Sequence, residues 1–137
     1  MEENKPQEES LEQKLQNINE TPDTTKDYDK QDIEKNKVMA ILAYFGILVL
    51  VPIFGAKDSK FARFHANQGL ILFIIMLVLW VLGQICLAIS LKFYAIMSVL
   101  FMICYLVLAV LAIMGIINAA RGKAKELPLV GKYRILK

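Results

Sequence analysis

Two long uncharged apolar runs, separated by one lysine, constrain the fold of this chain more than any other feature. Ala66–Leu91 has no charged residue over 26 residues, and Phe93–Ala120 has none over 28. A helix of about 20 residues, rising about 1.5 Å per residue, covers the roughly 30 Å of hydrocarbon in a bilayer. A chain of 137 residues has too small an interior to bury two such helices on all sides. The sequence therefore predicts two transmembrane helices in a hairpin that turns near Lys92.

The charged residues divide the chain into two unlike parts. Residues 1–37 carry six lysines and eleven acidic residues, whereas residues 38–137 carry ten basic and two acidic residues. The polar composition of residues 1–36 predicts a disordered acidic tail. Within it, Leu11, Leu15 and Ile18 share one helical stripe. That stripe is either a transient turn or a short helix that docks on a partner or on lipid.

The basic residues of the second part flank the apolar runs. They do not line a soluble face, so the sequence gives no indication of nucleic-acid binding. The lipid bilayer is the expected partner, with a membrane protein or a second copy of the chain as a further possibility. Basic clusters beside membrane segments face the cytoplasm and meet anionic lipid.

A shorter apolar segment, residues 38–54, precedes the two long runs. Its sixteen residues from Val38 to Ile53 reach about 24 Å as a helix, less than the hydrocarbon thickness. We expect Pro52 to break a helix near its end, with Gly46 and Gly55 loosening it further. The segment either spans with help from flanking lysines or dips into the membrane and returns.

The positive-inside rule favours the re-entrant arrangement, because it leaves Lys92 as the only basic residue outside. We therefore expect a multi-pass protein of the cytoplasmic membrane with both termini in the cytoplasm. The predicted fold is an all-α integral membrane protein, with two long transmembrane helices in a hairpin plus a short N-terminal apolar helix, spanning or re-entrant. The predicted organisation is an acidic tail at 1–36, a helical membrane domain at 37–122 (segments near 38–54, 66–91 and 93–120) and a basic C-terminal tail at 123–137.

The tail at 123–137 alternates apolar and basic residues after the helix, which Pro128 would stop. This alternation predicts a segment at the headgroup level, with Tyr133 and the leucines inward and the lysines toward phosphate. The simpler alternative is a solubilising tail.

Small and amide side chains indicate how the long helices pack. Small residues three or four apart allow helices to approach closely, either within the hairpin or between copies. Gln84 is the amide deepest in a predicted span, and we expect it to bond across the hairpin or between copies. The predicted packing residues are Gly83, Gln84, Ala109, Ala112, Gly115 and Ala119.

Trp80 and the two cysteines are also assigned to packing. Trp80 falls nearer the middle of its run than an interface belt requires. With a turn at Lys92, the depths of Cys86 and Cys104 differ by about 9 Å. A disulfide needs Cα atoms within about 7 Å, so we expect both to be small apolar fillers.

A polar stretch, residues 57–68, stands at the mouth of the first long run. Asp58 or Ser59 can cap a helix that starts near Lys60. At 100° per residue the stretch presents a basic, amide-bearing stripe beside an aromatic one, and His65 points away from Arg63. The candidate interaction face comprises Lys60, Phe61, Arg63, Phe64, His65, Asn67 and Gln68.

Three interpretations of this face compete. It is an interfacial anchor if Lys60 and Arg63 meet phosphate and the phenylalanines enter acyl chains. It is structural if its donors bind the carbonyl groups freed near Pro52. It is functional if it forms a polar entrance for a ligand or a translocating chain.

Residue types needed for catalysis are missing from the stretch and its surroundings. His65 is the single histidine, and no cysteine pair, nucleophile–histidine–acid set or glycine-rich phosphate loop accompanies it. Asp58 and Glu126 are the only acids after residue 37, too few for a proton relay. We therefore expect neither enzyme activity nor a catalytic, metal or cofactor site.

Two strings carry a resemblance to a known family. They are Lys57-Asp-Ser-x-Phe-x-Arg-Phe-His-x-Asn-Gln-Gly69 and Leu127-Pro-Leu-x-Gly131. From about residue 36 to 137 the chain resembles small bacterial membrane proteins of unknown function that are related to the chloroplast inner-envelope Tic import component. The resemblance implies a compact helical membrane module that is an accessory to protein translocation, and it adds no catalytic residue.

The leading functional hypothesis is a non-enzymatic membrane scaffold or accessory subunit that acts through its hairpin and the face at Phe61–Gln68. One alternative is a small oligomeric channel or transporter lined by Gln84, Asn118 and the small residues; the lack of an intramembrane charge argues against it. A second alternative is a lipid-interacting regulator that uses the basic C-terminal tail.

Overall fold

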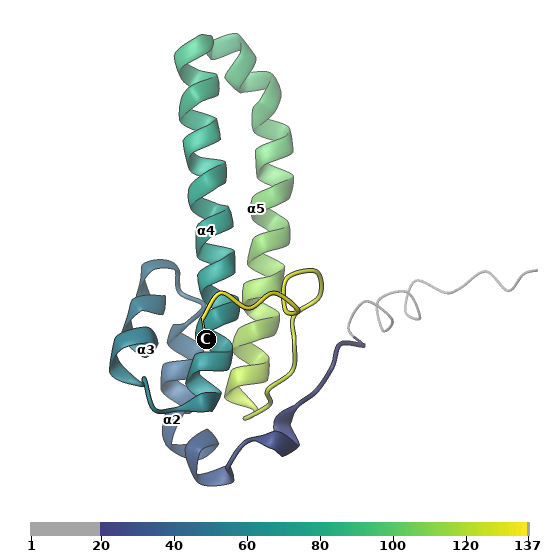
Figure 1. Ribbon diagram of the computed structural model, residues 1–137. Helices are drawn as coiled ribbons and strands as arrows, with labels where there is room; N and C mark the ends of the chain where they lie inside the picture. The colour runs from purple at the N-terminus through teal and green to yellow at the C-terminus, as the bar shows by residue number, and fades with distance from the viewer. Residues whose placement is uncertain (1–19, 137) are drawn as a thin grey trace, which may run out of the picture.

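The computed structural model describes residues 20–136 as a long helical hairpin with a compact head at one end (Figure 1). Apart from an isolated antiparallel bridge between Asp23 and Lys125, the described residues contain no strand pairing. The elements are η1 (Thr25–Asp27), α2 (Lys30–Leu42), η2 (Gly46–Val49), α3 (Leu50–Gly55), α4 (Lys60–Ile89) and α5 (Leu91–Ala120).

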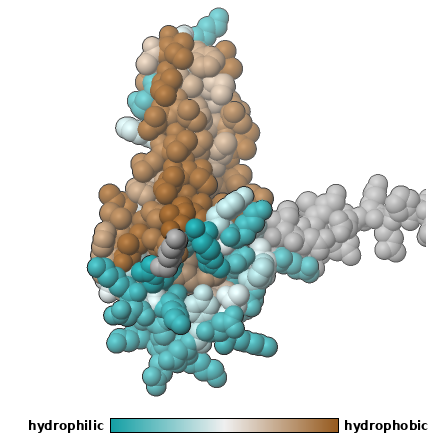
Figure 2. Space-filling view, in the orientation of Figure 1, coloured by the Kyte–Doolittle hydropathy of each residue, from teal (hydrophilic) through white to brown (hydrophobic). Residues whose placement is uncertain are grey.

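The hairpin is formed by α4 and α5, which turn at Ser90. Ser90 is extended (φ −168°, ψ 135°), and its N–H donates to the Cys86 carbonyl at 3.1 Å. The turn therefore comes two residues before Lys92. Only 17% of the most apolar stretch of α4 and 11% of that of α5 are buried. Figure 2 shows this apolar surface as a shaft above a hydrophilic head. The prediction of two helices long and apolar enough to cross a membrane is confirmed.

The first apolar segment is not one helix. The chain leaves α2 after Leu42, and Gly46 takes a positive φ of 58° before η2 begins. Glycine adopts this backbone conformation without the clash that a side chain would cause. Pro52, the third residue of α3, lies in its first turn, where a backbone N–H has no partner within the helix. The expected break at Pro52 is thus wrong, because the chain reverses at residues 43–46.

This reversal brings the first segment back to its starting end. The start of α2, the end of α3 and the start of α4 all lie at the head end of the hairpin (Figure 1). The structure thus has the shape of the re-entrant arrangement.

Residues 20–36 differ from the prediction of a disordered tail, because they are ordered on the head. The Tyr28 ring meets the rings of Phe61 and Phe64 edge-on, with centroids 6.4 and 5.9 Å apart. Ile33 is buried, and the Asp29 carboxylate caps α2 by accepting from the Gln31 N–H at 3.1 Å. Two apolar anchors hold this part of the chain, although its average composition is polar. The stripe of Leu11, Leu15 and Ile18 lies outside the described residues.

The small residues of α4 and α5 allow α2 to approach both helices closely. A Cβ atom on Gly69 would lie 1.8 Å from the Ala43 carbonyl oxygen, and one on Gly115 would lie 2.3 Å from the Tyr44 ring. Ala119 is buried, Ala112 is half-buried and Ala109 is exposed. The predicted small-residue stripe therefore faces the first segment at its head end and is open near Ala109.

Several predicted packing residues lie on the outside of the hairpin. Gln84 is exposed, and within the described chain no hydrogen bond joins its side chain to α5. Trp80 is 58% exposed, so it does not pack within the described hairpin, and packing of Trp80 against another copy stays a prediction. Gly83 is buried and faces Tyr94, and Cys86 and Cys104 are free thiols.

We predict that Gly115→Ala lowers the free energy of unfolding by about 1–3 kcal/mol, because the added methyl group overlaps the buried Tyr44 ring. Gly83→Ala is the matched control. Its methyl group would meet the Tyr94 ring at an ordinary 3.8 Å, and alanine favours helix over glycine. Thermal unfolding in mild detergent, followed by circular dichroism, measures both. Equal midpoints for the two variants would contradict the close approach at Gly115.

Candidate functional site

Four polar side chains are buried together where the hairpin enters the head. We call Tyr44, His65, Asn67 and Gln68 the polar latch. His65 and Gln68 have no exposed surface, and Asn67 is 2% exposed. A buried polar group without a hydrogen-bond partner costs on the order of 1–3 kcal/mol, so each group needs a partner.

His65 links α2 to the segment that follows α5. Its Nδ1 lies 2.7 Å from the Tyr44 hydroxyl, and its Nε2 lies 2.9 Å from the Lys123 carbonyl oxygen. A carbonyl oxygen only accepts, so Nε2 carries a proton and donates to it. Nδ1 then accepts from the Tyr44 hydroxyl. The network assigns a neutral imidazole with its proton on Nε2.

Gln68 extends the same chain of hydrogen bonds. Its Nε2 donates to the Tyr44 hydroxyl at 3.4 Å, and its Oε1 accepts from the Leu127 N–H at 2.6 Å. The chain therefore runs from the backbone at Leu127 through Gln68, Tyr44 and His65 to the backbone at Lys123.

Asn67 uses both ends of its amide on the last residues of the described chain. Its Nδ2 donates to the Tyr133 carbonyl at 2.7 Å. Its Oδ1 accepts from the N–H groups of Ile135 and Leu136 at 2.6 and 2.9 Å. Asn67 thus holds an extended segment that has no strand beside it.

The C-terminal segment, residues 123–136, folds back onto the head. Gly122 (φ 70°) ends α5, and the Lys123 N–H donates to the Asn118 carbonyl at 2.8 Å. Leu127 and Val130 are buried. The predicted interfacial tail is wrong for these two residues, because the latch directs the segment against protein; Leu129 and Tyr133 stay exposed.

A strap of residues 22–25 pairs with the start of this segment. The Thr24 N–H donates to the Ala124 carbonyl at 3.0 Å, and the Glu126 N–H donates to the Pro22 carbonyl at 3.0 Å. The Thr25 hydroxyl and N–H donate to the Asp23 carboxylate, which holds the pKa of that carboxyl below its usual range. The strap therefore joins the beginning of the described chain to the start of the C-terminal segment.

The predicted interaction face is mostly interior. Phe61, Phe64 and three latch residues are buried, and only Lys60 is fully exposed, with Arg63 half-buried. Arg134 lies 5.0 Å from the Phe64 ring centroid and pairs with Glu126 at 3.1 Å. The phenylalanines do not enter acyl chains, because Tyr28 and Arg134 cover them.

For two residues of the face, the partners differ from the carbonyl groups near Pro52 that the structural interpretation named. The side chains of Asn67 and Gln68 bind the C-terminal segment and the Tyr44 hydroxyl. The start of α4 is capped by Ser59, whose hydroxyl accepts from the Ala62 N–H at 3.0 Å; Asp58 beside it is exposed.

Sequence reasoning missed Tyr44 and Asp32. Tyr44 is a single hydroxyl in an apolar segment, which is a signal that it needs a buried partner. Asp32 accepts from the Phe61 N–H at 3.1 Å and from the Asn36 amide at 2.8 Å. Asp32 and Phe61 are 29 residues apart, so no local spacing signals their contact.

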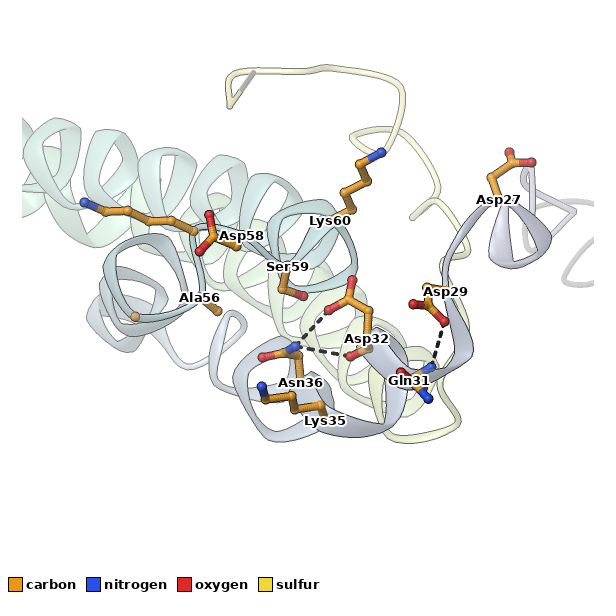
Figure 3. A pocket seen from close by; sticks show the side chains of 12 residues that line it. Asp27, Asp29, Gln31, Asp32, Lys35, Asn36, Ala56, Asp58, Ser59 and Lys60 are labelled. Carbon is orange, nitrogen blue, oxygen red and sulfur yellow. Dashed lines mark hydrogen bonds between the residues drawn. The ribbon is translucent and has the colours of Figure 1, made fainter.

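An open polar groove of about 680 Å³ lies between α2, the end of α3 and the start of α4 (Figure 3). Its walls mix acidic and basic side chains, and Asp32 and Asn36 are bonded to each other there. Among the described residues, no group of three or more His, Cys, Asp or Glu is placed to hold a metal ion. The groove residues are Asp27, Asp29, Gln31, Asp32, Lys35, Asn36, Gly55, Ala56, Lys57, Asp58, Ser59 and Lys60.

We predict that Asn67→Ala releases the end of the chain, because three hydrogen bonds to residues 133–136 are lost. Cleavage by trypsin after Lys132 and Arg134 should become about tenfold faster or more, since each lost bond is worth about 1 kcal/mol or more. Asn118→Ala is the control, because it removes the same amide from α5, where no hydrogen bond joins the side chain to residues 123–136. Mass spectrometry of the digests measures both rates, and equal rates would contradict the clamp.

Comparison with known proteins identifies relatives of the whole latched unit. Residues 35–135 match the model of the magnetosome magnetite crystal formation protein family, MamF/MmsF. The chain is 34% identical over 100 residues to the magnetosome protein MamF of Paramagnetospirillum magneticum, covering 72% of this chain and 82% of that protein. It is 29% identical over 96 residues to MmsF of the same organism, covering 70% and 82%. No solved structure matches the chain.

These matches correct two predictions. The resemblance to Tic-like proteins is wrong as a family assignment, because the matching family model and curated relatives are MamF and MmsF. The predicted role in protein translocation is also wrong, because the relatives are named for magnetosomes and the family for magnetite crystals.

Proposed function

Because this chain belongs to the magnetosome magnetite crystal formation protein family, we propose that it acts in forming magnetite crystals as a protein of the magnetosome membrane. The observation that carries the proposal is the extent of the match. Residues 35–135 include both hairpin helices, the polar latch and nearly all of the C-terminal segment that the latch holds. The family model therefore covers most of the described structure.

The geometry suits a protein that presents a fixed head at a membrane surface. The hairpin offers lipid an apolar surface, and the charged residues gather at the head (Figure 2). The latch side chains bind one another and the backbone, so these groups hold the shape of the head. We infer that the protein acts through the surface of its head and does not catalyse a reaction.

The proposed orientation places the head in the cytoplasm. Among the described residues after residue 37, Lys92 is the one basic residue near the tip of the hairpin, and the other basic residues lie in or beside the head. Basic residues near membrane segments are retained on the cytoplasmic side. Those in or beside the head are Lys57, Lys60, Arg63, Arg121, Lys123, Lys125, Lys132 and Arg134.

We predict that thiol labelling in spheroplasts of a host that forms no magnetosomes, with the chain in the cytoplasmic membrane, reports this orientation. Cys86→Ala and Cys104→Ala first remove the native thiols. A single cysteine at exposed Lys92 should react with a membrane-impermeant reagent, and one at exposed Asp58 or Lys132 should react only after the membrane is opened. Reaction at Asp58 before opening would reverse the orientation. If only one of the cysteines at positions 58 and 132 reacted before the membrane was opened, the two positions would lie on opposite sides. That result would contradict a shared head.

Complementation tests the proposed function. The host is a strain of Paramagnetospirillum magneticum that lacks its MamF and MmsF. The dimensions of the magnetite crystals in this strain and in its parent are the two reference values. We expect this chain to shift the dimensions of the magnetite crystals toward the parent, measured by electron microscopy. Gly83→Ala should act like the unmodified chain, and Gly115→Ala, which disturbs the head, should act less. Unchanged crystals, with the chain present in the magnetosome membrane fraction, would refute the proposal.

A further inference from the structure

The re-entrant part of the chain, η2 and α3, exposes an apolar surface beside only one half of the hairpin. No charged residue occurs from Val38 to Ala56. Six large apolar side chains of this part are 40–66% exposed, far more than a soluble head would leave in one short segment. They are Phe45, Ile47, Leu48, Leu50, Val51 and Phe54. We call residues 45–54 the wedge.

The wedge reaches only part of the way along the hairpin. A Cβ atom on Gly69 would meet the Ala43 carbonyl, and one on Gly46 would lie 3.8 Å from the end of the Met76 side chain. Met76 is about 10 Å beyond Gly69 along α4, whereas Gly69–Ile89 covers about 30 Å, the thickness of the hydrocarbon. This places the top of the wedge within the leaflet next to the head. Beyond the first segment the hairpin continues alone to its tip (Figure 1).

Three N–H groups at the top of the wedge are satisfied within the chain, which lowers the cost of placing them near hydrocarbon. The Tyr44 and Phe45 N–H groups donate to the Ile41 and Leu42 carbonyls at 3.2 Å each, and the Leu48 N–H donates to the Phe45 carbonyl at 3.1 Å.

A charged boundary marks where the wedge returns to the surface. The Lys57 ammonium lies 5.9 Å from the Phe54 ring centroid, and exposed Asp58 and Lys60 follow. A lysine beside an aromatic ring is typical of the headgroup level. The occupant of the apolar surface is therefore the acyl layer of the leaflet next to the head.

We propose that the wedge inserts into the head-side leaflet only and gives the protein a preference for membranes that curve away from the hairpin tip. This proposal rests on the proposed crossing of the membrane by the hairpin. The head-side leaflet accommodates the wedge, α4 and α5, whereas the opposite leaflet accommodates α4 and α5 alone. Insertion into one leaflet expands that leaflet and favours its convex curvature. The head should therefore lie on the convex face of a small vesicle.

The depth of a tryptophan in the bilayer tests insertion of the wedge separately from the crossing of the membrane by the hairpin. Trp80, the only tryptophan, is about 16 Å beyond Gly69 along α4 and is 58% exposed, so it reports the hairpin near the midplane. A variant with Trp80→Phe and Phe54→Trp reports the wedge. In vesicles of brominated phosphatidylcholine, bromines near the headgroup should quench the indole introduced at position 54 most, and bromines near the chain ends should quench Trp80 of the unmodified chain most. An unquenched indole at position 54 refutes the wedge; an unquenched Trp80 refutes the crossing.

Orientation in vesicles tests the curvature preference. The full chain, with Lys132→Cys as its only thiol, is reconstituted into small and large vesicles of the same phosphatidylcholine and phosphatidylglycerol mixture. Labelling with a membrane-impermeant maleimide measures the number of heads that face outward. Labelling after detergent is added measures the total number of heads. We expect the ratio of outward to inward heads to be several-fold higher in small vesicles than in large ones. Equal ratios at both sizes would refute the curvature preference.

Matched variants show whether the wedge is responsible. Ile47→Ser with Phe54→Ser makes two exposed wedge positions polar, at 64% and 66% exposure. Ile96→Ser with Leu100→Ser does the same at 66% and 52% exposure in the half of α5 near the tip. In the Ile47→Ser, Phe54→Ser variant, the ratio of outward to inward heads should become similar in small and large vesicles. In the Ile96→Ser, Leu100→Ser variant, the two ratios should still differ. The reverse result would assign the preference to another part of the molecule.

Discussion

The fold of the head depends on satisfying the polar groups that α4 buries before it enters the apolar shaft. The imidazole of His65 and the amides of Asn67 and Gln68 lie where water is excluded, so each must find a partner in the protein. Their partners are the Tyr44 hydroxyl and the backbone of residues 123–136. The C-terminal segment must therefore fold back, and its backbone in turn offers partners to the strap at residues 22–25.

Close packing adds a second requirement to this hydrogen bonding. Tyr44 reaches His65 and Gln68 because its ring lies over Gly115, and α2 comes near enough because Gly69 has no side chain to meet Ala43. The polar network thus depends on glycine at these two positions, because a side chain at either one would keep Tyr44 away from His65 and Gln68. The head and the hairpin are consequently one packed unit, and the height of the wedge along the hairpin is fixed by the contact of Ala43 with Gly69.

The sequence predicted the parts of the fold that local pattern decides. Two uncharged runs are sufficient to predict the hairpin, and Ser59 before Lys60 is a local cap signal. The head depends on pairs that are far apart in the chain: Gln68 and Leu127 are 59 residues apart, and Asn67 and Ile135 are 68 apart. Helix geometry placed His65 away from Arg63, yet His65 is as buried as Gln68, because both side chains contact Tyr44 and the C-terminal segment. The face at Phe61–Gln68 was therefore interpreted as an outer surface, although most of its side chains are buried.

The family error has a related physical cause. The string from Arg63 to Gly69 contains the latch residues His65, Asn67 and Gln68 and the close approach at Gly69, so it encodes the way this head is held together. Such a string identifies a structural solution, and one fold can serve different functions. The proposed function depends instead on side chains that the fold leaves exposed, in the groove between α2 and α4, at Lys57 and Lys60, and in the wedge. Substituting a latch residue tests whether the head forms. Substituting an exposed residue such as Lys57 or Phe54 tests what the head does, because the fold does not need either side chain to satisfy a buried partner.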